Sequence, residues 1–186
     1  MKTIVLLSIF IISLFTDNYL FSYDKKQYSL LKTGVENWND WRNEEPKIKI
    51  DLTSANLSKI DLTGANLNKS NLSKSNFIKT DLTGVFFIDS NLSFAKLNRA
   101  ILSYAILDHA KLFEANLTGA DLSYSNLSNA DLTDAIIKDA NFTEANFENT
   151  IISPKWKDYI QSQNVKNFDK IIWGDALQNS EEDLTE

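Results

Sequence analysis

The most regular feature of the sequence is a large apolar residue at every fifth position. From Leu52 to Ile152, all 21 of these positions hold Leu, Phe or Ile without a gap. A second column runs two residues earlier, from Ile50 to Thr150, and 18 of its 21 positions hold Ala, Ser or Thr. Neither an α-helix, with a period near 3.6, nor a flat strand, with a period of 2, explains this spacing.

A period of five keeps the large residue on one side only if the backbone turns a corner every five residues. Four corners close a coil of about twenty residues, and successive coils stack at about 4.8 Å, the spacing of paired strands. Large and small side chains alternate inside because a protein interior is close-packed. A fixed period is typical of a solenoid. The 21 repeats predict about five coils and a rod of about 24 Å.

The repeats resemble the pentapeptide-repeat family, whose consensus is A(D/N)LxX. The triplets that carry the resemblance are Ala55-Asn56-Leu57, Ala65-Asn66-Leu67, Ala115-Asn116-Leu117, Ala120-Asp121-Leu122 and Ala130-Asp131-Leu132. The resemblance implies an all-β solenoid, a right-handed quadrilateral β-helix. Its handedness follows from the family and not from the spacing. Some members of the family resemble duplex DNA in width and acidity and bind gyrase.

The composition changes on both sides of the predicted β-helix, residues 50–153. All four Trp lie in these flanks, and apolar residues there recur at helical spacing. Before the repeats, these residues are Leu31, Val35, Trp38, and Trp41 or Arg42, with Pro46 ending the helix. After the repeats they are Trp156, Tyr159 and Ile160, and then Phe168, Ile171 and Ile172.

We interpret the flanks as short helical caps at residues 23–49 and 154–178. Each cap covers an apolar end of the stack, which is favoured over a Trp-lined ligand site. The stretch from Glu36 to Arg42 resembles an N-terminal cap found ahead of the repeats in bacterial members of the family. Residues 179–186 are acidic and are expected to be a disordered tail.

The N-terminus has the pattern of an export signal. Lys2 precedes an apolar run from Thr3 to Phe15, which is typical of a secretory signal and shorter than the roughly 20 residues that span a bilayer. Residues 1–22 are therefore expected to be a signal peptide, and the protein to be periplasmic or secreted. An uncleaved membrane anchor and a cytosolic hydrophobic N-terminus are the alternatives.

Composition excludes several kinds of chemistry. With a net charge of -6, the chain is not a basic nucleic-acid binder. With no Cys and one His, it lacks disulfides, thiolate catalysis and Cys-ligated zinc. The sequence contains no nucleophile paired with a base, no phosphate loop and no metal motif, so no catalytic residue, cofactor or small-molecule substrate is expected.

Two weak candidate sites remain. Asp61 and Asp81 stack in adjacent coils, and two like charges close together raise a carboxyl pKa, but an open face gives catalysis no water-excluding pocket. His109 stands in a column between Asp89 and Asn129, which could bind a metal weakly. We interpret both as ordinary surface groups.

Several outward positions are apolar in the middle of the rod. The candidate partner-binding residues are Phe86, Ile88, Tyr104, Ile106 and Tyr124. Counted modulo twenty, they share one corner and the start of the next face on adjacent coils. Phe94 and Ile101 lie further around, and Phe113 further still. Contiguous exposed apolar surface marks a contact site, unless the C-terminal flank folds over it, and both interpretations stay open.

Charge separates the two halves of the rod. Residues 50–100 hold six basic and four acidic residues, a net +2, whereas residues 101–152 hold two basic and eight acidic, a net -6. Lys59, Lys79 and Arg99 share one column. The first hypothesis is a non-enzymatic exported scaffold that binds an unidentified protein, and the alternative is a DNA-mimic inhibitor of gyrase. A homodimer through a terminal cap is also possible.

Overall fold

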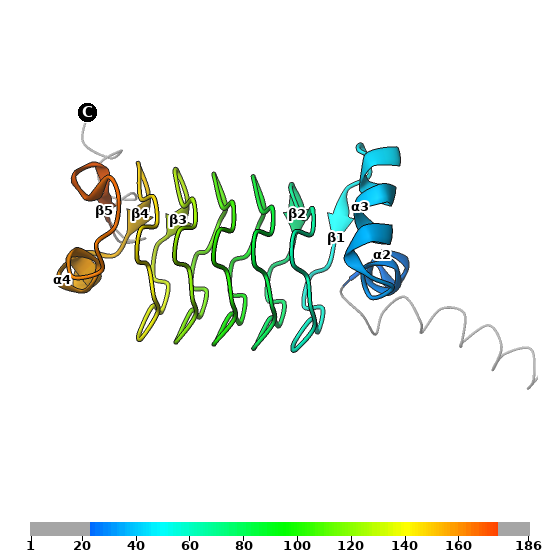
Figure 1. The fold of residues 1–186 in the computed structure, drawn as a ribbon, viewed down its shortest axis with the longest axis horizontal. Coiled ribbons are helices and arrows are strands. Elements are labelled where there is room, and N and C mark those ends of the chain that lie inside the picture. The colour runs from blue at the N-terminus through cyan, green and yellow to red at the C-terminus, as the bar shows by residue number, and fades with distance from the viewer. Residues whose placement is uncertain (1–22, 175–186) are drawn as a thin grey trace, which may run out of the picture.

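The computed structural model describes residues 23–174 as a stack of coils with a helical segment at each end (Figure 1). The predicted signal peptide, residues 1–22, and the predicted acidic tail, residues 179–186, lie outside the described residues. So do residues 175–178, the end of the predicted C-terminal cap.

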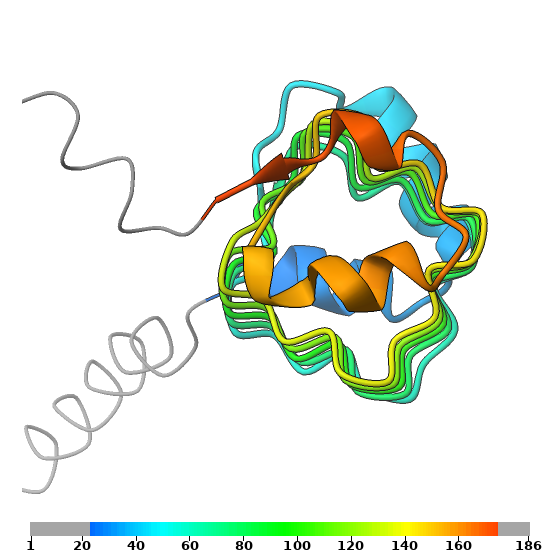
Figure 2. The same ribbon diagram turned by 90° about the vertical axis from the view of Figure 1, so that its left-hand side faces the viewer.

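The stack is held together by parallel pairing between residues twenty positions apart. Most of the pairing consists of single bridges, such as those of Asn56 with Asn76 and of Asp61 with Asp81. Two-residue strands form where the pairing is longer. β1 (Ile50–Asp51) pairs with β2 (Ser70–Asn71), and β3 (Asp131–Leu132) pairs with β4 (Ile151–Ile152). The pairing therefore repeats every four pentapeptides, and the coils superpose when seen along the rod (Figure 2).

Each corner is a tight turn with a left-handed residue. The Ala55 N–H donates to the Leu52 carbonyl at 3.0 Å, and the same bond recurs along the rod. Every fifth residue from Ser54 to Asn149 has a positive φ, and only Gly64, Gly84 and Gly119 among them lack a side chain. A left-handed conformation costs an L-residue roughly 1–2 kcal/mol, so most of the corners carry local strain that the interior must offset.

The two periodic columns of the sequence form the core. All 21 large residues from Leu52 to Ile152 are at most 1% exposed, and every member of the small column except Ile60 is buried. Most buried hydroxyls of the small column find acceptors: Thr80 and Ser90 each donate to a carbonyl oxygen at 2.6 Å. The Ser125 hydroxyl has no partner among the described residues. The predicted inward direction of both columns is confirmed at these positions.

Two helices lie at the N-terminal end of the stack, α2 (Lys25–Leu31) and α3 (Val35–Glu44). The single helix predicted through Leu31 and Arg42 is wrong, because the chain breaks at Gly34, which has a φ of 127°. Glycine tolerates that conformation, whereas other residues rarely adopt it. Pro46 follows the end of α3, as the sequence predicts.

The first coil has no earlier coil to pair with, and side chains of these helices bond to its backbone groups instead. The Gln27 amide donates to the Lys49 carbonyl at 2.9 Å and accepts from the Asp51 N–H at 2.8 Å. The Trp38 indole N–H donates to the Asn66 carbonyl at 2.8 Å, and its ring is 0% exposed. These bonds matter because an unpaired buried backbone group costs about as much as a lost hydrogen bond.

The C-terminal end is built from η1 (Pro154–Trp156), α4 (Lys157–Gln161), η2 (Phe168–Lys170) and β5 (Ile172–Trp173). Helix α4 crosses the end of the stack (Figure 2). The helical recurrence predicted from Phe168 to Ile172 is wrong, because a 3₁₀ turn leads there into a strand. β5 pairs in parallel with β4, so the ladder continues beyond residue 153.

Side chains near α4 bond to the last complete coil. The Trp156 indole N–H donates to the Ala135 carbonyl at 3.1 Å, and the Tyr159 hydroxyl donates to the Ala140 carbonyl at 2.7 Å. The Gln163 side-chain oxygen accepts from the Phe142 N–H at 3.3 Å. Flanking side chains thus bond to backbone groups at both ends of the stack.

Candidate protein-binding surface

Two pairs of apolar side chains lie outside the core on one corner and on the face that follows it. Tyr104 and Tyr124 occupy the corner position of adjacent coils, and their rings stack with centroids 5.2 Å apart and planes only 7° apart. Both side chains are open to solvent, at 59% and 50% exposed. The stack is therefore a flat aromatic surface that carries a polar hydroxyl at the edge of each ring.

The second pair lies on the adjoining face, two positions after the corner position of the repeat. Phe86 and Ile106 are bridged between adjacent coils, and Phe86 is 42% exposed whereas Ile106 is half-buried. Ile88, the fifth predicted residue, is half-buried one step further along the face. We define the aromatic corner as Phe86, Ile88, Tyr104, Ile106 and Tyr124.

The tyrosines of the aromatic corner occupy strained backbone positions. Tyr104 and Tyr124 each have a φ of 60°. Glycine, asparagine and aspartate are the residues that adopt this region most readily, and bulky residues seldom do. The same conformation recurs at every corner from Ser54 to Asn149, so it belongs to the fold, and the exposed aromatic stack is what distinguishes this corner.

The apolar residues on the face also replace a recurring hydrogen bond. At the equivalent positions, Asp81 and Asn126 accept a backbone N–H two residues ahead, at 3.0 Å and 3.1 Å. Phe86 and Ile106 have no side-chain acceptor for such a bond. The Ile88 N–H donates instead to the Asn68 side chain in the neighbouring coil, at 2.7 Å. Apolar surface at this corner thus takes the place of local polar stabilisation.

A second aromatic pair lies on a different corner. Phe94 and Phe113 meet edge to face with centroids 5.5 Å apart, and Phe94 is 42% exposed. Sequence reasoning placed them apart because they occupy different positions within the pentapeptide. The two residues meet because the backbones of adjacent coils pair at this turn, where the Phe94 N–H donates to the Phe113 carbonyl at 2.8 Å.

The stacked carboxylates do not form an acid–base pair. Asp61 and Asp81 are bridged as predicted, but hydrogen bonds from the Thr63 N–H and side chain hold the pKa of Asp61 below its ordinary value. The N–H bond is 2.9 Å long. The expected increase in a carboxyl pKa is therefore wrong for Asp61, because local hydrogen bonds to the charged form favour ionisation.

His109 bonds to its neighbour in sequence and not to the residues in its column. Its Nδ1 lies 3.0 Å from an Asp108 carboxylate oxygen, and the other Asp108 oxygen accepts from the Asn129 amide at 2.9 Å. Within residues 23–174, no group of three or more His, Cys, Asp or Glu is arranged to hold a metal. The weak metal site considered for this column gains no support from its neighbours.

The described part of the C-terminal flank leaves the aromatic corner open. Residues 154–174 lie at the end of the stack (Figure 1), whereas the tyrosines keep half or more of their surface in solvent. The aromatic corner is thus an accessible surface within residues 23–174.

No helix in the described part of the chain is both long and apolar enough to span a bilayer.

Comparison with known proteins adds the family. Pentapeptide repeats match in eight copies across residues 49–84, 75–112, 90–123 and 110–149, which together span more than half of the chain. The comparison with curated proteins finds no match.

Three solved structures illustrate the similarity. A pentapeptide repeat protein from the Arabidopsis thaliana thylakoid lumen is 27% identical, with a TM-score of 0.34 and coverage of 62% of this chain and 76% of that one. Rfr23 from the cyanobacterium Cyanothece 51142 is 22% identical, with a TM-score of 0.36 and coverage of 73% and 97%. QnrB1, a plasmid-mediated fluoroquinolone resistance protein, is 17% identical, with a TM-score of 0.33 and coverage of 53% and 70%.

The family match explains the architecture and the kind of role. Pentapeptide repeats imply a right-handed β-helix, and proteins built from them generally have binding or structural roles. The five-residue period, the parallel pairing at twenty residues and the eight matched copies all lead to one conclusion. The chain belongs to the pentapeptide-repeat family.

Proposed function

We propose that the protein is a non-enzymatic, exported scaffold that binds a partner protein through the aromatic corner. The observation that carries the proposal is the exposed stack of Tyr104 on Tyr124. Tyrosine is enriched in protein interfaces because its ring supplies a large apolar contact while its hydroxyl can bond to a partner. Three residues around the stack, Phe86, Ile88 and Ile106, extend the apolar surface.

Physical costs support this proposal. The two apolar residues on the face, Phe86 and Ile106, forgo the side-chain bond that Asp81 and Asn126 make at equivalent positions. Folding alone favours Asp or Asn at the face, because their side chains bond to the local backbone. A binding role explains why apolar residues stand there instead.

The ends of the rod complete the proposed architecture. We infer a quadrilateral β-helix of about five coils at residues 50–153, with end caps formed by residues 23–49 and 154–178. The bonds from Gln27 and Trp38 at one end, and from Trp156 and Tyr159 at the other, support the capping role. Caps are required because a bare end exposes apolar interior and unpaired strand edges.

Export rests on the N-terminal pattern, in which Lys2 is followed by an apolar run. Immunoblotting of separated cell fractions tests this part of the proposal directly. Recovery of a shortened chain from the periplasm or the medium supports export with cleavage near residue 22. Recovery of the full chain from the cytosol alone contradicts it.

Affinity capture with two matched variants tests the contact surface. Ile106→Lys places a charge in the aromatic corner. Ile136→Lys makes the same change on another face, at a residue that is 46% exposed. We expect the wild-type chain and Ile136→Lys to recover the same partner, and Ile106→Lys to lose it. Equal recovery by both variants removes the aromatic corner from consideration.

Inhibition of gyrase by DNA mimicry is the alternative function. The net charge of -6 between residues 101 and 152, from two basic and eight acidic residues, favours it. The basic column of Lys59, Lys79 and Arg99 opposes it, because a DNA mimic presents negative charge. A supercoiling assay separates the two functions, since only the DNA mimic inhibits gyrase in the absence of another partner.

A further inference from the structure

A cationic cavity lies where the end of α3 meets the first two coils. It has a volume of about 500 Å³ and is lined by the end of α3, by the connection from α3 to β1, and by the neighbouring coil. The lining residues are Arg42, Pro46, Lys47, Ile48, Lys49, Ile50, Asp51, Lys69 and Asn71. Ligand sites for small molecules commonly have volumes between roughly 300 and 1,000 Å³.

The charge of the lining is strongly unbalanced. Four cationic side chains, Arg42, Lys47, Lys49 and Lys69, face one carboxylate, Asp51. One oxygen of that carboxylate already accepts from the Thr53 N–H at 3.1 Å and from the Thr53 hydroxyl at 2.6 Å. Within residues 23–174, none of the four cations forms an ion pair. The cavity therefore carries excess positive charge.

Arg42 is the most demanding of these cations because it is buried. Its side chain is 8% exposed, and its two terminal nitrogens donate only to backbone carbonyls, at 3.1 Å to Asn68 and at 3.4 Å to Ile48. Its Nε has no acceptor among the described residues. Burial also lowers the pKa of the guanidinium. A buried charge without a counter-ion is costly, so an anion nearby would stabilise this end of the molecule.

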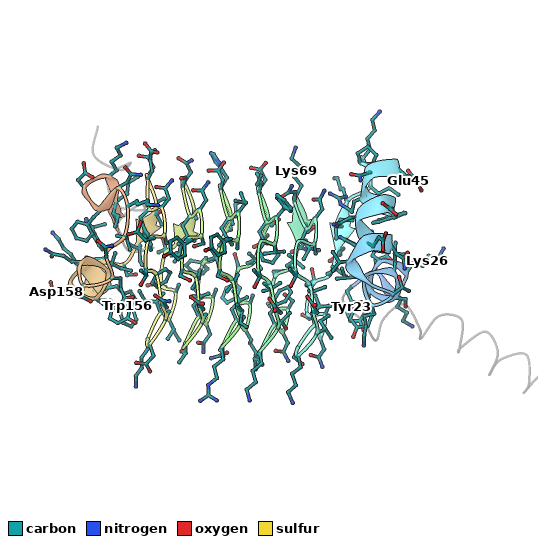
Figure 3. The ribbon with its side chains drawn as sticks, viewed as in Figure 1. Tyr23, Lys26, Glu45, Lys69, Trp156 and Asp158 are labelled. Atoms are coloured by element: carbon teal, nitrogen blue, oxygen red, sulfur yellow. The ribbon has the colours of Figure 1, made fainter. Side chains whose placement is uncertain are left out.

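We propose that this cavity binds a phosphate group. A phosphate dianion offsets most of the excess charge and offers several acceptor oxygens to guanidinium and ammonium donors. The apolar side chains of Pro46, Ile48 and Ile50 lie beside the cations and can contact the organic part of a phosphate ester. Lys69 points outward from the stack (Figure 3) and lines the cavity, so its ammonium group can reach a ligand there.

The phosphate has two possible sources, a soluble phosphate ester or the headgroup of an anionic lipid. Inorganic phosphate, titrated into the full chain in a calorimeter at low ionic strength, probes the soluble form. Co-sedimentation with phosphatidylcholine vesicles, with and without phosphatidic acid, probes the lipid form. Vesicles of phosphatidylcholine alone reveal any binding that does not depend on the phosphate group.

Two matched double variants make the test specific. Lys49→Gln with Lys69→Gln removes two charges from the cavity and leaves Arg42 in place. Lys59→Gln with Lys79→Gln removes the same charge from a different corner, and Lys59, Lys69 and Lys79 all have a positive φ near 60°. We expect the cavity variant to weaken binding by about tenfold or more, because each lysine contributes a direct charge interaction. The control variant should bind within about twofold of wild type because distant charges are screened.

Either source supports the proposal when the loss is confined to the cavity variant. Saturable binding of inorganic phosphate identifies a soluble ligand, and binding only to vesicles with phosphatidic acid identifies a lipid. Absence of binding in both assays overturns the proposal. Equal weakening by the two double variants overturns it as well, and so does equal binding to both kinds of vesicle when inorganic phosphate does not bind.

Discussion

The order of inward and outward side chains can be tested at two consecutive residues. Leu107 is 0% exposed, and so are Phe87 and Leu127, which occupy the same position in the adjacent coils. Its neighbour Ile106 is only half-buried. Replacing each residue in turn by Ala therefore changes the core in one variant and the surface in the other.

The expected magnitude follows from the burial of Leu107. Truncation to Ala removes three carbons, each worth about 0.8 kcal/mol of transfer free energy. Hydrogen bonds hold the coil on both sides: the Leu107 N–H donates to Asn126 at 2.7 Å, and the Phe87 N–H donates to Ile106 at 2.8 Å. The cavity cannot collapse freely, so a further cavity term brings the loss to about 3–5 kcal/mol. Ile106→Ala should cost about 1 kcal/mol or less.

Urea unfolding monitored by circular dichroism measures both variants against the wild-type chain. The free energy of unfolding should fall strongly for Leu107→Ala and slightly for Ile106→Ala, with unchanged dependence on urea. A Leu107→Ala variant as stable as wild type would refute the inward direction of this column. Equal losses in the two variants would refute the alternation of the side chains.

Three further predictions concern a corner, an end of the rod and a surface carboxylate. At the corner, Lys74 has a φ of 60°, so Lys74→Gly should raise stability by about 0.5–1 kcal/mol and Lys74→Val should lower it by at least as much, as thermal melting can show. At the end of the rod, Trp38→Phe loses the 2.8 Å bond to Asn66 and should cost about 1–3 kcal/mol. Trp41→Phe, which loses no such bond among the described residues, is the control, and equal losses in urea unfolding would contradict the capping role. For the carboxylate, Thr63→Val should move the pKa of Asp61 upward toward its ordinary value of 3.8, measured by NMR titration. Because the folded-state pKa is lowered, the stabilisation by Asp61 is present above pH 3.8 and is lost as pH falls through the folded-state pKa. An unchanged titration in Thr63→Val would show that the hydroxyl is not the cause.

The sequence predicts the repeat region well because its period reports directly on packing. A residue such as Leu107 recurs every five positions only if the backbone bends at the same interval, and a fixed volume requires small residues beside it. The aromatic corner was predictable for a related reason. A polar outward column is the rule, so Tyr104 and Phe86 stand out against it.

The flanks were less predictable because no repeat constrains them. The break at Gly34 depends on a positive φ that helical spacing does not reveal. The strand at Ile172 depends on pairing with a coil twenty-one residues earlier, whereas the local sequence has helical periodicity. The cationic cavity has no signature in the sequence, because Arg42 and Lys69 are distant along the chain and only the packing of α3 against the coils brings them to one site.

Site-specific cross-linking tests the central claim, that the aromatic corner contacts a partner protein. A photoreactive amino acid replaces Tyr104 in one variant and Ile136 in another, and both are irradiated in intact cells. The account predicts one discrete cross-linked product from position 104 and none from position 136. No product from position 104, or the same product from both positions, would contradict it.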